Sequence, residues 1–175
     1  MNHLENTQLE HVDHKPSETK YSLCFLAHDI DAPMNIGSFF RIADALGIEK
    51  IYLTGKSVVP PNNKIKKTSR STEKFVDYSY EQAPLVIVSQ LKNEGYKIVS
   101  LEITSSSIDL SKAKFSAKDK ICLILGSENT GVSQELLDVS DISVYIPMLG
   151  MNSSMNVANA CSIAAYEITK GLRNE

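Results

Sequence analysis

The sequence of 175 residues predicts an α/β fold, in which a mostly parallel sheet carries helices on both faces. Short apolar runs typical of buried strands recur along it, the clearest being ICLIL at 121–125. Segments with the apolar spacing of amphipathic helices separate these runs. The length suits one compact domain, since domains usually contain roughly 100 to 200 residues. We therefore expect a single domain over residues 21–175, preceded by a disordered polar tail over residues 1–20.

The first expected elements are a strand, a helix and a second strand. Residues 21–28 form a continuous apolar run that predicts a buried strand. Residues 35–47 place apolar side chains on one stripe at helical spacing, and Asn35 suits the N-cap position of this helix. The run at 49–55 predicts the next strand.

Residues 56–74 form a basic segment, in which six lysines and arginines accompany a single acidic residue. Two prolines and two asparagines near its start predict a loop. The formal net charge of -3 excludes a protein that coats nucleic acid indiscriminately, so any site for a polyanion must be local. Lys66, Lys67 and Arg70 are the candidates for such a site, and a solvated surface loop is the alternative.

The second half of the chain continues the alternation of strands and helices. We predict strands at 74–79, 96–104, 120–126 and 142–148, and helices at 81–95, 133–139 and 154–172. Gly95 ends the first of these helices, and Ser133 suits the N-cap of the second. The third is rich in alanine, so its flat surface suits close packing against another helix.

Several common kinds of site are absent from the sequence. Neither the glycine-rich dinucleotide motif nor the P-loop motif occurs. No apolar run approaches the roughly 20 residues of a membrane helix, and the N-terminus lacks an apolar signal core, so we expect a cytoplasmic protein without membrane contact. Cys24, Cys122 and Cys161 form no C-x-x-C pair and are expected to be buried reduced thiols. We predict no metal site, and His28 is expected to be a structural residue at a strand end.

Three polar motifs follow predicted strands, where the ligands of open α/β sheets collect. The first contains Asn35, Gly37 and Arg41. Gly37 lowers helix stability, so it indicates that another chain or a ligand comes close to its backbone, and Arg41 on the same helix face can hold a phosphate. For this motif alone, an N-capped amphipathic helix with a surface arginine is the alternative.

The second and third motifs surround the last predicted strand. Gly126 ends the buried strand at 120–126, and Glu128 and Gly131 follow it, where a carboxylate can bind a hydroxyl or a cation, or hold its own loop. The third motif, residues 154–157, begins the last helix and places Asn156 in its first turn. The loop before it offers amides and hydroxyls that suit a polar ligand.

Together and in this order, the motifs N-x-G-x-x-x-R, G-x-E-x-x-G and S-M-N-V resemble those of the SpoU (TrmH-like) group of the SPOUT superfamily. The resemblance covers roughly residues 21–172. It implies an S-adenosylmethionine-dependent methyltransferase that modifies ribose 2′-hydroxyls of RNA, either tRNA or rRNA. It also implies a deep C-terminal trefoil knot and a homodimer in which the last helix packs against its copy.

The resemblance also implies roles for residues. Asn35, Arg41, Glu128 and Asn156 form the catalytic set, in which Arg41 clamps an RNA phosphate or acts as general base and the others orient it and the ribose. The implied cofactor contacts are Ile103, Thr104, Gly126, Ile146, Met148, Ser154 and Met155. A side chain added at Gly126 is expected to fill space beside the cofactor. Arg41 joins Lys66, Lys67 and Arg70 as the expected RNA contacts.

Two departures and two alternatives accompany this interpretation. The family often has a Gly-Ala pair where this chain has SRST at 69–72, and Met155 replaces the more usual leucine, a change that conserves volume. One alternative is a knotted module that binds RNA or cofactor without methylating. The other is a SPOUT enzyme that methylates a base nitrogen, which the intact first motif disfavours.

Overall fold

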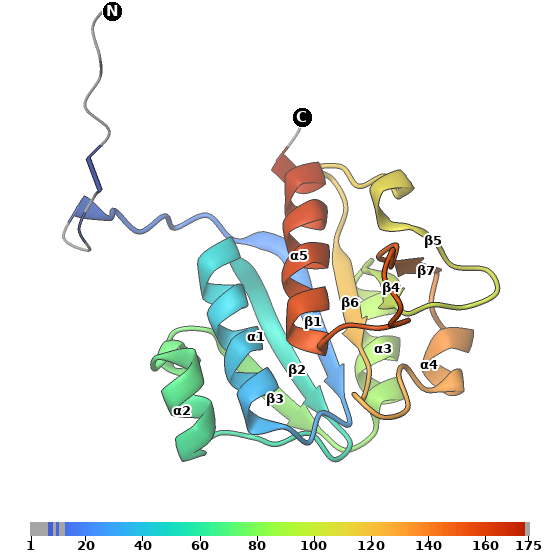
Figure 1. Cartoon of the computed structure of the whole chain (residues 1–175), viewed down its shortest axis with the longest axis horizontal. Helices are drawn as coiled ribbons and strands as arrows, with labels where there is room; N and C mark the ends of the chain where they lie inside the picture. Colours follow the sequence, from blue (N-terminus) through green and yellow to red (C-terminus); the bar gives the residue numbers. More distant parts are fainter. Residues whose placement is uncertain (1–6, 9, 11–12, 174–175) are drawn as a thin grey trace, which may run out of the picture.

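The computed structural model describes residues 7, 8, 10 and 13–173 and has the α/β architecture that the sequence predicts (Figure 1). The described residues of the predicted tail precede the first strand as an exposed segment, and the rest of that prediction lies outside the described residues. The division into a tail and a single domain stays a prediction.

One sheet of seven parallel strands organises the described residues, in the spatial order β3-β2-β1-β6-β4-β7-β5. The strands are β1 (Tyr21–His28), β2 (Ile48–Thr54), β3 (Asp77–Glu81), β4 (Lys97–Leu101), β5 (Ile108–Asp109), β6 (Ile121–Leu125) and β7 (Ile142–Tyr145). The chain builds β1 to β3 toward one edge of the sheet and the later strands toward the other. In such a sheet, a ligand is expected where this order reverses, beyond the carboxyl ends of the central strands.

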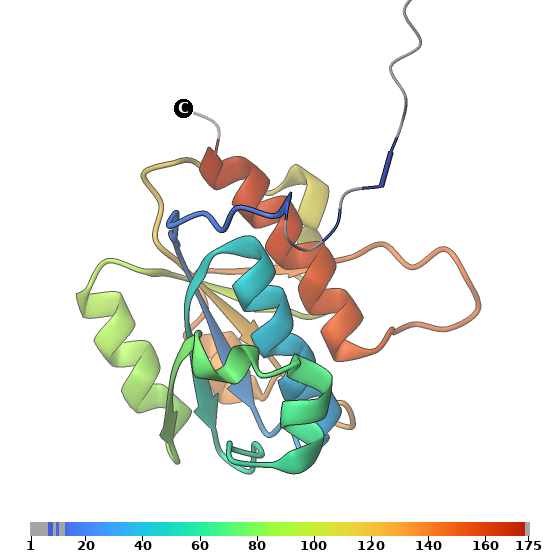
Figure 2. The same ribbon diagram turned by 90° about the vertical axis from the view of Figure 1, so that its left-hand side faces the viewer.

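Helices cover both faces of the sheet, as Figures 1 and 2 show. They are α1 (Pro33–Leu46), α2 (Asn63–Ser69), α3 (Pro84–Asn93), α4 (Gln134–Asp138) and α5 (Val157–Arg173). Alternate side chains of β1 enter two separate cores. Leu23 and Phe25 pack on the side of α1 and α5, whereas Cys24 and Leu26 pack on the side of α3 and α4. Burial on both faces confirms the predicted fold class.

The prediction that Asn35 is the N-cap of the first helix was wrong. α1 begins two residues earlier, at Pro33, with Ala32 in the N-cap position. Proline suits the first helical turn because its fixed φ is helical and an N–H there would have no partner within the helix. Asn35 therefore lies inside α1, is 9% exposed, and is available for side-chain contacts with distant segments.

The last helix, in contrast, begins later than predicted, at Val157 instead of residue 154. Asn156 precedes it, and the Asn156 Oδ1 accepts hydrogen bonds from the N–H groups of Ala158 (2.9 Å) and Asn159 (3.3 Å). These are the contacts of an N-cap residue. Asn156 is thus fixed in orientation at the point where the polar loop becomes a helix.

The alanine-rich face of α5 packs against the chain's own core. Cys161, Ala164 and Ala165 are fully buried there. The expectation that this flat face presses against a second copy was wrong, because α1 and the sheet already cover it. Small side chains indicate close packing but do not identify the packing partner.

The basic segment, residues 56–74, is not a loop throughout. It contains α2 and a short 3₁₀ helix at Thr72–Lys74. The Asn62 Oδ1 caps α2 by accepting from the N–H groups of Lys64 (2.9 Å) and Ile65 (3.3 Å). Ile65 is the only apolar residue of α2, too few to give a periodic pattern, so the helix could not be recognised.

Two further differences lie at the edges of the sheet. β3 begins at Asp77, where it pairs with β2, and not at residue 74 as predicted. The two-residue β5 and the 3₁₀ helix Leu110–Lys112 were not predicted. Elements this short carry almost no periodic signal.

Gly37 allows two helices of the same chain to pack closely. A Cβ added here would lie 2.7 Å from the Thr68 Cβ and 2.9 Å from the Ile65 carbonyl oxygen. α2 therefore occupies the space that we expected a ligand or another chain to use. The contact holds the basic α2 against the helix that carries Arg41.

The cysteines are free and buried, as predicted. A hydrogen bond with Cys122 and burial raise the pKa of the Cys24 thiol, and burial raises that of Cys161, so both stay protonated and unreactive. His28 ends β1, as predicted, with its Nδ1 3.0 Å from the Thr54 Oγ1. Within the part of the chain that the structure describes, no helix is long and apolar enough to span a membrane, and no group of three or more potential metal ligands occurs.

Candidate functional site

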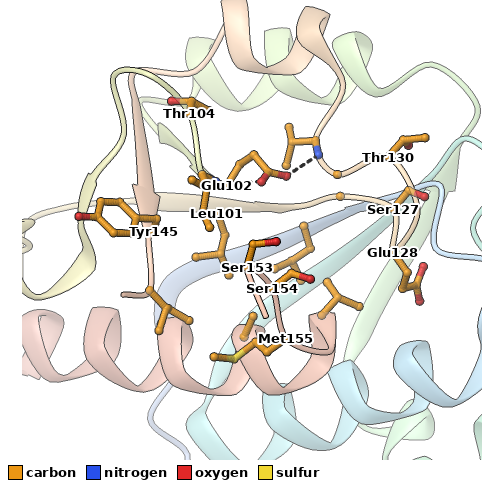
Figure 3. Close-up of a pocket in the computed structure, with 18 of the residues that line it drawn as sticks. Leu101, Glu102, Thr104, Ser127, Glu128, Thr130, Tyr145, Ser153, Ser154 and Met155 are labelled. Carbon is orange, nitrogen blue, oxygen red and sulfur yellow. Dashed lines mark hydrogen bonds between the residues drawn. The ribbon is translucent and has the colours of Figure 1, made fainter. Parts of the chain in front are cut away.

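A cavity of about 1060 Å³ lies beyond the carboxyl ends of β4, β6 and β7 (Figure 3). Most of its lining comes from three segments: residues 101–105 after β4, residues 125–132 after β6, and parts of 145–160, which include the loop before α5. The second of these segments carries the second motif, and the third carries the third motif. The cavity thus lies on the side of the sheet where a ligand is expected.

All seven residues predicted to contact a cofactor line this cavity. They are Ile103, Thr104, Gly126, Ile146, Met148, Ser154 and Met155, and two residues of the predicted catalytic set, Glu128 and Asn156, line it as well. In Figure 3, Ser154 and Met155 approach the cavity from the side of α5, and Leu101 approaches it from the sheet. The structure brings these residues together, whereas their roles toward a ligand stay predictions.

Asn35 joins the three motifs through its side-chain amide. Its Nδ2 donates a hydrogen bond to the Glu128 Oε1, and its Oδ1 accepts one from the Asn156 Nδ2 at 3.0 Å. These partners lie 93 and 121 residues away along the chain. Because the Asn156 Oδ1 already caps α5, the Asn156 Nδ2 is the group left to donate to Asn35.

This hydrogen-bonded chain, Glu128–Asn35–Asn156, fixes the positions of its members relative to one another. Asn35 is nearly buried and its bond to Glu128 is charge-assisted, so the arrangement is stronger than one between neutral surface groups. Among the hydrogen bonds of the described residues, Glu128 uses only Oε1. The Oε2 therefore remains available to accept a hydrogen bond from a ligand.

Gly126 lies against the backbone of its own loop. A Cβ added here would come far inside van der Waals contact with the carbonyl group of Gly131 and the nitrogen of Val132. The expectation of open space beside a cofactor was therefore wrong for this position. The loop closes on itself through two hydrogen bonds between Ser127 and Gly131, at 3.1 and 2.8 Å, and Gly126 permits that close approach.

Glu102 lines the cavity but was not predicted from the sequence. Its carboxylate accepts hydrogen bonds from the N–H groups of Ile103 (2.8 Å) and Val132 (3.0 Å). Figure 3 shows the second of these bonds crossing from the end of β4 to the loop after β6. No signal marked it, because Glu102 lies within the strand predicted at 96–104, whereas β4 ends at Leu101.

Arg41 does not line the cavity. It is exposed on α1, six residues after Asn35, and forms no ion pair with another described residue. Lys66, Lys67 and Arg70 are exposed on or directly after α2, also away from the cavity. Because α1 packs against α2 and the following 3₁₀ helix, these four cations belong to one flank of the molecule.

The chain matches known proteins over most of its length. The model of the SpoU rRNA Methylase family matches residues 22–166. The tRNA (guanosine(18)-2′-O)-methyltransferase of Escherichia coli (strain K12) is 25% identical over 148 residues, which are 83% of this chain and 62% of that protein. The chain thus spans less than two thirds of this relative's length.

Two solved structures share the fold. The SpoU methyltransferase AviRb from Streptomyces viridochromogenes, in complex with AdoMet, has a TM-score of 0.78 and 25% identity, covering 89% of this chain and 62% of that one. The second solved structure is described as giving structural insights into the 2-OH methylation of C/U34 on tRNA. It has a TM-score of 0.74 and is 25% identical, and the match covers 86% of this chain and 96% of that one.

The family match spans all three motifs, from Asn35 to Asn156, and hence the whole Glu128–Asn35–Asn156 arrangement. It also includes the three segments that form most of the cavity lining. The chain therefore belongs to the SpoU rRNA Methylase family.

Proposed function

We propose that the chain is an S-adenosylmethionine-dependent RNA 2′-O-methyltransferase that acts on tRNA or rRNA. The observation that carries the proposal is the hydrogen-bonded chain Glu128–Asn35–Asn156, which joins the three motifs beside a large cavity. Family membership and the tRNA-modifying relative support this reaction. The cytoplasm, where tRNA and rRNA are used in translation, is the proposed location.

The cavity has the size and lining that a nucleoside cofactor requires. Its volume of about 1060 Å³ lies just above the roughly 300–1,000 Å³ usual for small-molecule sites. Apolar side chains such as Leu101 and Met155 suit an adenine ring, and the hydroxyls of Ser127, Thr130 and Ser154 suit the ribose and amino acid parts. The AdoMet complex of AviRb supports the identity of the cofactor. When bound, S-adenosylmethionine supplies an already activated methyl group.

The chain's own residues then have to position a weak nucleophile. A ribose hydroxyl is barely ionised at neutral pH, so its alignment and the removal of its proton determine the rate. The available Glu128 Oε2 can accept a hydrogen bond from the ribose, while Asn35 and Asn156 hold Glu128 in place. Arg41 is the proposed clamp on an adjacent phosphate, because its planar guanidinium remains charged and binds phosphate through two parallel bonds.

The proposal can be tested by incubating the protein with methyl-labelled S-adenosylmethionine and total cellular RNA. We expect label in the RNA. If the protein binds S-adenosylhomocysteine or RNA but transfers no label, the binding-module alternative is correct. If label enters a base, the base-nitrogen alternative is correct.

The RNA backbone is proposed to lie across Lys66, Lys67 and Arg70. Replacing all three with glutamine should weaken RNA binding for every sequence, because phosphate contacts release counterions without reading bases. The slope of log affinity against log salt should decrease by about 0.7–0.9 per lost contact. Affinity for S-adenosylhomocysteine should not change, since none of the three lines the cavity.

A matched control for this variant replaces Lys112, Lys114 and Lys118, three exposed lysines elsewhere on the chain, with glutamine. It removes the same charge and should keep most of the salt slope. Filter binding at several salt concentrations measures both variants. If the first variant kept the salt slope of the wild type, Lys66, Lys67 and Arg70 would belong only to a solvated surface.

We propose a homodimer formed through the outer side of α5. Ile163 and Tyr166 are 44% and 56% exposed on that side, and they border a shallow pocket with Ile146 and Pro147. Exposed apolar side chains surrounded by polar ones mark protein interfaces, and a helix against its copy is a usual contact in two-fold dimers. The buried alanine face of α5 takes no part in this contact.

Family resemblance also supports the trefoil knot, with the loop before α5 as its threaded segment.

Replacing both Ile163 and Tyr166 with glutamate should give a folded monomer, because the two side chains lie outside the core while charges in a close interface are costly. Val86→Glu is the control, since Val86 is 55% exposed on α3 at the other face of the sheet. Analytical ultracentrifugation at micromolar concentration distinguishes the outcomes. A persistent dimer would place the interface on another face.

A further inference from the structure

We propose that Glu102 is a positioning residue that sets the affinity of the cavity for S-adenosylmethionine by holding the loop Gly126–Val132. The inference rests on the proposed function for the identity of the ligand. It concerns a residue outside the three motifs.

The Glu102 carboxylate connects two neighbouring strand ends. Its Oε1 accepts from the N–H of Ile103, directly after β4, and its Oε2 accepts from the N–H of Val132, at the end of the loop after β6 (Figure 3). Val132 is 5% exposed, and its N–H has no other partner among the described residues. Without the carboxylate this donor would be left buried and unpaired, which is costly.

Gly131 shows how closely the loop passes the carboxylate. A Cβ added to Gly131 would collide with the Glu102 Oε2, and the backbone there has φ +69°, a conformation that favours glycine. Gly131 therefore allows both the turn and the hydrogen bond beside it. The position of Glu102 and the identity of Gly131 are thus coupled.

The loop has one anchor near each end. Ser127 and Gly131 pair through their backbones, so the segment between them forms one closed unit. Glu128 anchors that unit to Asn35, and Glu102 anchors the following residue, Val132. Residues 125–132 all line the cavity. Loss of the Glu102 anchor should therefore displace one wall of the cavity.

Glu102→Ala and Glu102→Gln test this assignment in the full-length protein. Glu102→Ala should raise the Kd for S-adenosylhomocysteine about tenfold, the effect of one lost charged hydrogen bond, and should speed hydrogen exchange at the Val132 amide. Glu102→Gln keeps one acceptor oxygen but opposes an N–H donor with its own NH₂, so its effect should be smaller. The Kd for RNA should change less than about twofold in both variants, because the proposed RNA contacts Lys66, Lys67 and Arg70 lie away from the cavity.

Asp141→Asn is the matched control. The Asp141 Oδ2 also accepts a backbone N–H, that of Ile98 at 2.7 Å, but near the opposite end of β4 and away from the cavity. This variant should lower thermal stability without changing the Kd for S-adenosylhomocysteine. If Glu102→Ala behaves in the same way as Asp141→Asn, Glu102 only stabilises the fold and the inference is wrong.

A double-mutant cycle with Gly131→Ala tests the coupling. Gly131→Ala should weaken S-adenosylhomocysteine binding strongly in the wild type but less in Glu102→Ala, where the collision is removed. Additive effects would contradict the inference. If the wild-type protein does not bind S-adenosylhomocysteine, the proposed function fails. Hydrogen exchange at Val132 then still reports whether Glu102 holds the loop, so the two failures are distinguishable.

Discussion

Arg41→Ala is expected to lower the turnover number for methyl transfer about 10²–10³-fold, the usual effect of removing one preorganised group that stabilises a transition state. The variant should fold normally, because Arg41 is exposed and forms no ion pair with another described residue. Its Kd for S-adenosylhomocysteine should equal that of the wild type, since Arg41 does not line the cavity. Single-turnover kinetics and calorimetry measure these two quantities.

Two further variants sharpen this result. Arg41→Lys keeps the charge but loses the planar fork, so it should recover little activity if Arg41 clamps a phosphate through two bonds. Arg173→Ala is the control, because Arg173 lies over the Tyr21 ring at the start of β1, at the end of the sheet opposite the cavity. Near-wild-type turnover in Arg41→Ala would remove Arg41 from the catalytic set.

Gly126→Ala is expected to abolish cofactor binding by displacing the loop, and not by filling space beside the ligand. Its Cβ would overlap the backbone of Gly131 and Val132, which cannot move without breaking the Ser127–Gly131 pairing. Overpacking of this kind costs about 1–3 kcal/mol, so the free energy of unfolding should fall by that amount. Calorimetry with S-adenosylhomocysteine and denaturant unfolding measure the two effects.

Gly150→Ala provides the matched control. A Cβ at Gly150 would meet nothing within 4 Å, although this residue also belongs to a loop next to the cavity. That variant should keep the stability and the ligand affinity of the wild type. A folded Gly126→Ala protein with unchanged affinity would show that the loop after β6 does not shape the binding site.

The main strands and the site loops could be predicted because their signals are local. Continuous apolar runs identify buried strands, and the loops that follow parallel strands meet at one edge of the sheet. The seven cofactor candidates came instead from the family resemblance, and all of them line one cavity. Membership of the SpoU rRNA Methylase family agrees with the resemblance drawn from the three motifs.

The contacts that hold the site together could not be predicted, because they depend on packing between distant segments. Asn35 suits an N-cap by its own chemistry, yet Pro33 begins the helix and leaves Asn35 to bind Glu128 and Asn156. The alanines of α5 indicate close packing, but only the fold shows that the chain itself supplies the partner. Glu102 belongs to no motif, and its function in the loop depends on Val132, 30 residues away.

The proposed reaction of this chain is the transfer of a methyl group to a ribose 2′-oxygen of RNA. The most direct measurement labels total RNA with the wild-type protein and methyl-labelled S-adenosylmethionine, then hydrolyses the RNA in alkali. Alkaline cleavage requires a free 2′-hydroxyl, so a 2′-O-methylated nucleotide remains joined to its 3′ neighbour. We predict label in alkali-stable dinucleotides, and about 10²–10³-fold slower labelling with Arg41→Ala. Label in mononucleotides, or no label with a wild-type protein that binds S-adenosylhomocysteine, would contradict this proposed reaction.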